Sequence, residues 1–231
     1  MRISILAACC AILTASSAQA ITVIDDFSST SLGSSYADLP EGLSTFADIG
    51  GIGGTRAISF NSIHTPFTSE DIRFRVRATS GELQVRAEDH MADLTLTYDA
   101  GGAGLSFDQS LGTKFSLNLD TDTLGFGRTT GATMTITDGS GEVATVANLF
   151  SSFQNVNGTV LVLDFANADF IANNSLIDLS DIDVIALTYQ SGEGEDFNIS
   201  SFVTNVQAVP TPGPVGGALA IAGLAAARRR R

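Results

Sequence analysis

Hydrophobic and polar residues alternate along much of the chain between residues 21 and 208. The segment 72–77 reads Ile-Arg-Phe-Arg-Val-Arg, and the segment 82–88 alternates in the same way after Ser80-Gly81. A period of two places alternate side chains on opposite faces of a β-strand. A short turn that contains glycine favours a hairpin between these two segments.

The same pattern predicts an all-β fold. One short helical turn is expected at Asn167 to Asn173, and a Ser- and Gly-rich link, 28–54, is expected to wrap one edge of the fold. Many short strands with little helix favour a single β-sandwich domain of the jelly-roll type. The expected strands are 21–27, 55–61, 72–77, 82–88, 92–98, 103–108, 113–119, 131–138, 142–149, 159–165, 183–190 and 196–205.

The expected hairpin gathers basic residues on one face. A two-residue turn places Arg75 opposite Arg86 and Arg77 opposite Gln84. Like charges on neighbouring strands are unfavourable unless something neutralises them. Either nearby aspartates such as Asp93 do so, or the face binds an acidic polysaccharide or another anion, because guanidinium groups bind carboxylates in a bidentate manner. The candidate ligand-binding residues are Arg73, Arg75, Arg77 and Arg86.

The first 20 residues have the layout of a Sec signal peptide. Arg2 precedes the apolar segment 3–13, and Ala18-Gln19-Ala20 fits the small-x-small cleavage rule. The sequence therefore predicts export and a mature domain that begins at Ile21. Both cysteines, Cys9 and Cys10, lie in this leader, so the domain has no cysteine for a disulfide.

The last 23 residues, 209–231, form a separate tail. A proline-rich motif precedes the apolar run 215–227, and four arginines end the chain. A helix of 13 residues spans about 20 Å, which is short of the ~30 Å hydrocarbon core of a membrane. We expect a short hydrophobic helix that anchors the chain weakly, with its positive end in the cytoplasm. The motif residues are Val209, Pro210, Thr211, Pro212, Arg228, Arg229, Arg230 and Arg231.

This tail resembles the PEP-CTERM sorting signal, in which a Pro-Glu-Pro-like motif precedes a short apolar helix and an arginine cluster. Thr211 stands where the family most often has glutamate. The resemblance implies processing by an exosortase-type enzyme and transient contact with the inner membrane. It also implies a place in the cell envelope or outside the cell, in association with exopolysaccharide and biofilm. The alternative is an ordinary single-pass anchor.

The two ends of the domain resemble the terminal strands of galactose-binding-like, carbohydrate-binding jelly rolls. The segments concerned are 23–27, which reads Val-Ile-Asp-Asp-Phe, and Asp196-Phe197. The motif Gly53-Gly54-Thr55-Arg56 also recurs in PEP-CTERM proteins of that shape. This resemblance implies that the terminal strands meet in space.

Meeting of these strands would bring Asp25, Asp26 and Asp196 together. Calcium takes six to eight oxygen ligands, which carboxylates and carbonyl groups supply, so these residues are a candidate structural calcium site. The alternative is that they are aspartates that cap turns. Two further acidic clusters are weaker candidates: Asp120 with Asp122, and Asp178 with Asp181 and Asp183.

Charge and residue types limit the function. Seven basic residues lie in the domain against 25 acidic ones, which gives it a formal net charge of −18 and argues against a nucleic-acid partner. Its two histidines, His64 and His90, are expected in loops, and it has no tryptophan and no Gly-x-Ser-x-Gly motif. We therefore expect a non-catalytic protein of the envelope or matrix. The alternatives are a carbohydrate-binding module for acidic extracellular polysaccharide and a glycan-active enzyme.

Overall fold

The protein is a β-sandwich. The computed structural model describes residues 19–32, 37–39, 42–64, 74–79, 81–86, 90–124, 128–150 and 154–207. Within this part of the chain, thirteen strands form two antiparallel sheets, which confirms the expected fold class. Residues Ile21–Val206 make up one compact unit that contains every buried core side chain described below.

One sheet has seven strands. Six follow the order β11-β8-β13-β6-β5-β2, and β1 pairs with β13, so the two terminal strands meet as expected. The strands are β1 (Gln19–Asp25), β2 (Ala37–Leu39), β5 (Phe74–Thr79), β6 (Glu82–Arg86), β8 (Gly112–Leu124), β11 (Gln154–Ala166) and β13 (Asp196–Gln207).

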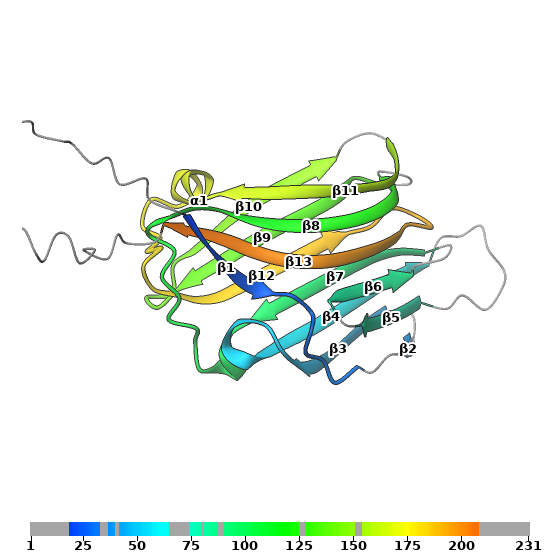
Figure 1. Cartoon of the computed structure of the whole chain (residues 1–231), viewed down its shortest axis with the longest axis horizontal. Helices are drawn as coiled ribbons and strands as arrows, with labels where there is room; N and C mark the ends of the chain where they lie inside the picture. Colours follow the sequence, from blue (N-terminus) through cyan, green and yellow to red (C-terminus); the bar gives the residue numbers. More distant parts are fainter. Residues whose placement is uncertain are drawn as a thin grey trace, which may run out of the picture. The chain divides into compact units, whose positions relative to one another are not determined.

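The other sheet has six strands in the order β10-β9-β12-β7-β4-β3. Figure 1 shows β8, β11 and β13 of the seven-stranded sheet lying over β9, β10 and β12 of this one. The strands are β3 (Gly42–Ile49), β4 (Thr55–His64), β7 (His90–Tyr98), β9 (Thr130–Asp138), β10 (Val143–Phe150) and β12 (Ile182–Gln190).

The core lies between the sheets and follows the alternation of each strand. Along β7, Leu94, Leu96 and Tyr98 are buried, and the residues between them face outward. Aromatic rings join the two layers: the ring centroids of Tyr189 on β12 and Phe197 on β13 lie 4.5 Å apart. Burying such a side chain contributes about 1.5–3 kcal/mol, so the inward rows of both sheets hold the layers together.

Helical structure is short. The helix α1 (Asn167–Asn173) lies where the sequence predicts a helical turn, and it buries Phe170. Two 3₁₀ turns, η1 (Ile52–Gly54) and η2 (Ala100–Gly102), complete the helical elements of the described residues.

Three local expectations are wrong. The link 28–54 contains β2 and β3, and β3 escapes a periodicity search because its apolar Leu43 and Ile49 face solvent. The segment 103–108 forms a single bridge instead of a strand, since Gly104 and Ser106 have positive φ angles that an extended strand does not allow.

The two histidines are the third correction. His64 ends β4 and His90 begins β7, and their Cα atoms are paired across the ladder instead of lying in loops.

Candidate functional site

The hairpin β5–β6 has the register that the sequence predicts. Arg75 pairs with Arg86, and Arg77 pairs with Gln84. On β6, Leu83 and Val85 are buried, whereas Arg86 is exposed, so the register places the arginines on the outer face of the seven-stranded sheet. Arg73 lies outside the described residues, and the side chains of Arg75 and Arg77 are not described.

Polar residues continue this row onto the neighbouring strands. Asp196 of β13 pairs with Arg86, and Asn198 pairs with Gln84 on one side and Asp120 of β8 on the other. The side chains of Arg86 and Asp196 form an ion pair at 3.5 Å and remain 54% and 40% exposed. We call Arg75, Arg77, Gln84, Arg86 and Asn198 the arginine face.

Asp93 does not neutralise this face, but a neighbouring aspartate, Asp196, pairs with Arg86, as the first of the two interpretations of the sequence allows. Asp93 lies on β7 of the other sheet, where its carboxylate is 2.7 Å from Nη2 of Arg128. Asp196 is one carboxylate beside the arginine face, and an exposed pair of this kind contributes about 0–1 kcal/mol. The register therefore pairs two arginines across the hairpin, and the side chain of Arg86 is 54% exposed.

A second arginine, Arg56, is fully buried between two carboxylates. Its Nη1 is 2.6 Å from Oδ2 of Asp25 on β1, and its Nη2 is 2.6 Å from Oδ2 of Asp48 on β3. Nη2 also donates to the carbonyl oxygen of Ser29 at 3.0 Å, and the guanidinium carbon lies 5.0 Å from the centre of the Phe27 ring. This network ties β1 and the loop after it to the six-stranded sheet.

Hydrogen bonds and neighbouring charges keep Asp48 ionised and Tyr98 protonated. Burial raises the pKa of Asp48, but the backbone and hydroxyl donors of Ser31 and the charge of Arg56 outweigh it and lower the pKa below its usual value. Burial, together with the charge of Asp25, raises the pKa of the Tyr98 hydroxyl well above its usual value. Tyr98 therefore stays protonated and donates to Asp25 at 3.0 Å.

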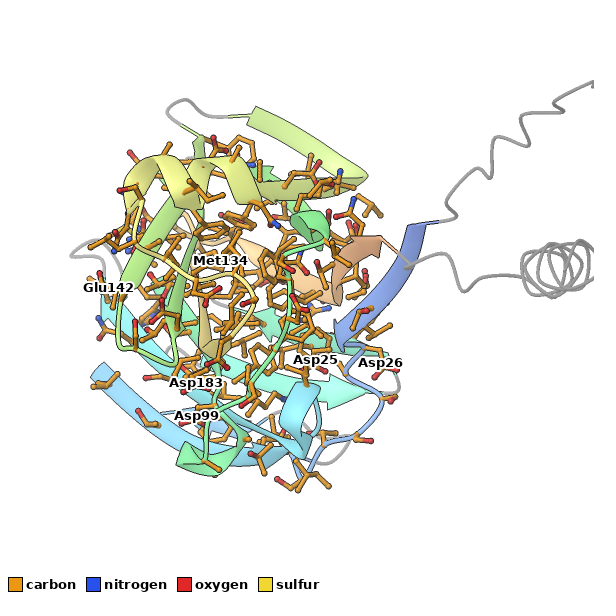
Figure 2. The ribbon with its side chains drawn as sticks, turned by 90° about the vertical axis from the view of Figure 1, so that its left-hand side faces the viewer. Asp25, Asp26, Asp99, Met134, Glu142 and Asp183 are labelled. Atoms are coloured by element: carbon orange, nitrogen blue, oxygen red, sulfur yellow. The ribbon has the colours of Figure 1, made fainter. Side chains whose placement is uncertain are left out.

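A shallow hollow of about 460 Å³ lies next to this network. Figure 2 shows Asp25 and Asp26, which line the hollow, at the end of β1 and away from Asp183. The hollow is lined by Val23, Ile24, Asp25, Asp26, Ser29, Ile49, Gly50, Gly51, Ile52 and Gly54.

The candidate calcium residues have other partners. Asp25 is neutralised by Arg56, the Asp26 carboxylate accepts bonds from the backbone N–H and hydroxyl of Ser28, and Asp196 faces Arg86. Across the described segments, no three carboxylates or histidines come close enough to hold a metal ion. The structure therefore gives the calcium site at Asp25, Asp26 and Asp196 no support, and it stays a prediction.

The weaker acidic clusters have structural roles as well. Asp120 lies within β8 instead of in a loop. The Asp178 carboxylate accepts bonds from the backbone N–H and hydroxyl of Ser180, which lowers its pKa. These are turn and strand positions, as the alternative interpretation holds.

A second buried network is centred on the carboxylate of Glu195. The hydroxyl of Tyr189 donates to Glu195, which also accepts bonds from the Thr121 hydroxyl and the backbone N–H of Gly192. Burial, together with the charge of Glu195, raises the pKa of the Tyr189 hydroxyl well above its usual value. This group fixes the turn between β12 and β13 to β8.

The sequence alone predicted no role for Arg56, Asp48 or Glu195. A signal was present, because Arg56 is in phase with the inward residues Ile58 and Phe60 of the same strand. A charged residue in phase with buried apolar ones indicates a buried ion pair, since an unpaired charge there is too unfavourable.

Most of the two ends of the chain lies outside the described residues. The leader, apart from Gln19 and Ala20 at the start of β1, and the whole tail 209–231 lie outside the described residues. In the part that is described, no helix is long and apolar enough to cross a membrane. The signal peptide and the sorting motif stay predictions.

Comparison with known proteins identifies no family. No family model and no curated protein match the chain. Among solved structures, the family 11 carbohydrate-binding module of a cellulosomal cellulase of Clostridium thermocellum is similar, with 12% identity over 84% of this chain and 99% of the module and a TM-score of 0.38.

Two further structures have comparable likeness. A family 29 carbohydrate-binding module complexed with mannohexaose has 12% identity over 81% of this chain and 92% of that one, with a TM-score of 0.34. An agarase has 15% identity over 83% of this chain and 25% of its own, with a TM-score of 0.37. At these identities and scores, the likeness carries no argument about ligand or activity.

Proposed function

We propose that the domain of residues 21–208 binds an acidic extracellular polysaccharide through the arginine face, without catalysing a reaction. The observation that carries this proposal is the pairing of Arg75 with Arg86 across neighbouring strands of a solvent-facing sheet. Two like charges opposed in this way destabilise the free domain. A bound polyanion relieves that repulsion, so the face is a better site for an anionic polymer than for a neutral one.

The residues around the two arginines suit a polysaccharide rather than a small anion. Paired Cα atoms in an antiparallel ladder lie about 4.5–5.5 Å apart, so two guanidinium groups can contact neighbouring carboxylates of a polymer. Gln84, whose amide donates to Glu82 at 2.9 Å, and Asn198 continue the row with amide groups, and an amide can donate to and accept from sugar hydroxyls. A polymer that runs across the strands would meet charged and neutral donors in turn.

We further propose that the protein is exported and remains with the cell envelope or extracellular matrix. The leader and the PEP-CTERM-like tail support this part of the proposal. An exosortase-type enzyme would process the tail after transient insertion in the inner membrane. Deleting residues 209–231 should then release the domain into the culture medium, and retention of the truncated protein in the envelope would contradict the sorting role.

A binding experiment on purified residues 21–207 tests the proposed ligand class. Affinity electrophoresis should show retardation by a polyuronate such as alginate and little by a neutral glucan, and salt should weaken the retardation because it screens charged contacts. An absence of binding at millimolar sugar would overturn the proposal. Release of reducing ends from either polymer would instead indicate a glycan-active enzyme.

The calcium prediction can be tested on the same material. A cation that binds only the folded state raises the melting temperature. An unchanged melting temperature in chelator would remove Asp25, Asp26 and Asp196 as a calcium site.

A further inference from the structure

The hollow beside the buried Arg56 network has apolar side chains in its lining. Val23 of β1 and Ile49 of β3 both line it, and they are 50% and 53% exposed. Ile52 of η1 is a third aliphatic side chain of the lining and is partly buried. Exposed aliphatic groups that converge on one hollow can pack against the apolar part of a ligand.

Glycine residues keep this hollow open. Gly51 and Gly54 line it with φ angles of +71° and +81°, which favour glycine. A Cβ atom at Gly54 would meet no atom within 4 Å, so the space beside this residue is empty of protein. The volume of about 460 Å³ lies within the range of about 300–1,000 Å³ that is typical of small-molecule sites. The hollow is therefore large enough for a small organic ligand.

One exposed carboxylate in the lining can accept a hydrogen bond from such a ligand. Ser28 donates its hydroxyl and its backbone N–H to Oδ1 of Asp26, at 2.6 and 2.9 Å. These bonds lower the pKa of Asp26, so its carboxylate is ionised at neutral pH. Both bonds reach the same oxygen, so Oδ2 of this exposed side chain can accept from a ligand.

The charge around the hollow favours a cationic ligand. Asp25 and Asp26 line it, and Asp48 belongs to the adjacent buried network. The network sets one guanidinium, that of Arg56, against these three carboxylates. An ammonium group is therefore attracted here, whereas the carboxylates of an acidic polysaccharide are repelled. The hollow and the arginine face thus favour opposite charges.

We propose that the hollow binds a sugar that carries a protonated amine, with the ammonium group on Oδ2 of Asp26 and the C–H face of the ring against Val23 and Ile49. A lysine side chain of a protein partner has the same charge, but it is too slender to fill a hollow of this volume. The site does not depend on the arginine face. If both sites bind, one domain holds an anionic and a cationic polymer together, as a crosslink in the matrix.

Calorimetric titration of residues 21–207 with a glucosamine oligomer tests this proposal. These residues hold the whole core, and added chelator prevents competition by divalent cations. The wild type should bind this oligomer and should bind its fully N-acetylated form, which has the same rings without charge, at least about tenfold more weakly. Asp26→Asn should weaken binding about fivefold or more, because it removes the charge but keeps an oxygen that accepts from Ser28.

The matched control is Asp108→Asn, which removes an equal charge from the same kind of turn. Asp108 accepts bonds from the hydroxyl and the backbone N–H of Ser110, at 2.7 and 2.9 Å, as Asp26 does from Ser28, but it does not line the hollow. This variant should change binding by less than about twofold. Equal losses in the two variants would assign the binding to general attraction by the acidic domain and would overturn the proposal.

Three other outcomes would also overturn it. One is a wild type that does not bind the glucosamine oligomer at millimolar concentration. Another is equal binding of the N-acetylated oligomer, which would assign the hollow to a neutral sugar. The third is a lysine oligopeptide that binds as tightly as the glucosamine oligomer, which would assign the hollow to a protein partner.

Cysteine labelling locates the site independently of affinity. The domain has no cysteine, so Ile49→Cys and Val162→Cys each introduce a unique thiol, at positions that are 53% and 56% exposed. Val162 lies on β11 and does not line the hollow. Saturating glucosamine oligomer should slow alkylation of the thiol at position 49 about threefold or more and leave that at position 162 unchanged. An unchanged rate at position 49 would contradict binding in the hollow.

Discussion

Arg56 and Arg86 lie in the same domain and face carboxylates, but their surroundings differ completely. Arg56 is buried with two carboxylates at 2.6 Å, and its other contacts are a carbonyl oxygen and an aromatic ring. Arg86 is half exposed, with a carboxylate at 3.5 Å and another arginine as its ladder partner. The buried arginine is held on every side by the fold, whereas about half of the Arg86 side chain is accessible to solvent. Burial, more than residue type, therefore distinguishes an arginine that stabilises the fold from one that can bind a ligand.

The largest expected effect comes from breaking the buried pair. Arg56→Met leaves Asp25 and Asp48 buried without their counter-ion, so we expect the free energy of unfolding to fall by about 3–5 kcal/mol. Urea denaturation of residues 21–207 would measure it. The matched variant Arg86→Met should change stability by less than about 0.5 kcal/mol. Similar losses in the two variants would refute the division between structural and binding arginines.

Crowding around the buried pair gives the next largest effect. A Cβ atom at Gly51 would lie 2.6 Å from the Tyr98 ring and 3.1 Å from a carboxylate oxygen of Asp25, at a φ of +71°. Gly51→Ala should therefore cost about 2–4 kcal/mol, from backbone strain and overpacking together. Gly54→Ala has a similar φ of +81° but no atom within 4 Å, so it should cost about 1 kcal/mol. Equal melting temperatures for the two variants would show that Tyr98 and Asp25 can shift to make room for a side chain without loss of stability.

The buried pair should also make stability depend on pH. The pKa of Asp48 is lower in the folded protein than the value of about 3.9 in an unfolded chain. Its contribution is therefore fully present above the unfolded pKa and is lost as pH falls through the folded one. Denaturation between about pH 5 and pH 2 should give a smaller decrease in stability for Asp48→Asn than for the wild type. If the stability of Asp48→Asn and of the wild type fell equally with pH, Asp48 would not be the source of the pH dependence.

The smallest effect is expected at the exposed pair. Asp196→Asn removes the carboxylate beside Arg86, so polyuronate should bind about two- to fivefold more tightly, as expected for loss of one weak exposed contact. Affinity electrophoresis would measure the change. Weaker binding by this variant would indicate that Asp196 positions Arg86 for the ligand instead of competing with it.

The sequence was sufficient for the fold class and for part of the candidate site. Alternation over 72–77 and 82–88, with a short turn between them, set the register that pairs Arg75 with Arg86. The helical turn at Asn167–Asn173 and the meeting of the terminal strands were also predicted. The hairpin and the helical turn depend on residues close in the sequence or on a strong period, which a pattern can detect, whereas the meeting of the terminal strands followed from the resemblance to jelly rolls.

The buried networks depend on contacts that periodicity does not encode. Arg56 meets a carboxylate 31 residues away in Asp25, and Tyr98 meets the same carboxylate across 73 residues. The strand β3 was missed for a related reason: its inward Asp48 serves this network, while its apolar Leu43 is 73% exposed. Although Phe46 of this strand packs against the core, the rest of its pattern differs from that of an ordinary half-buried strand.

The proposed function requires that Arg75 and Arg86 of the β5–β6 hairpin bind an acidic polysaccharide. The most direct test is calorimetric titration of residues 21–207 with a polyuronate, in the wild type and in the variant that combines Arg75→Ala with Arg86→Ala. We predict that the wild type binds and that the variant binds at least about tenfold more weakly, since each arginine–carboxylate contact contributes about 1.5–3 kcal/mol. The melting temperature of the variant should be equal or slightly higher, because the repulsion between the two arginines is removed. Undiminished binding by the folded variant would contradict the account.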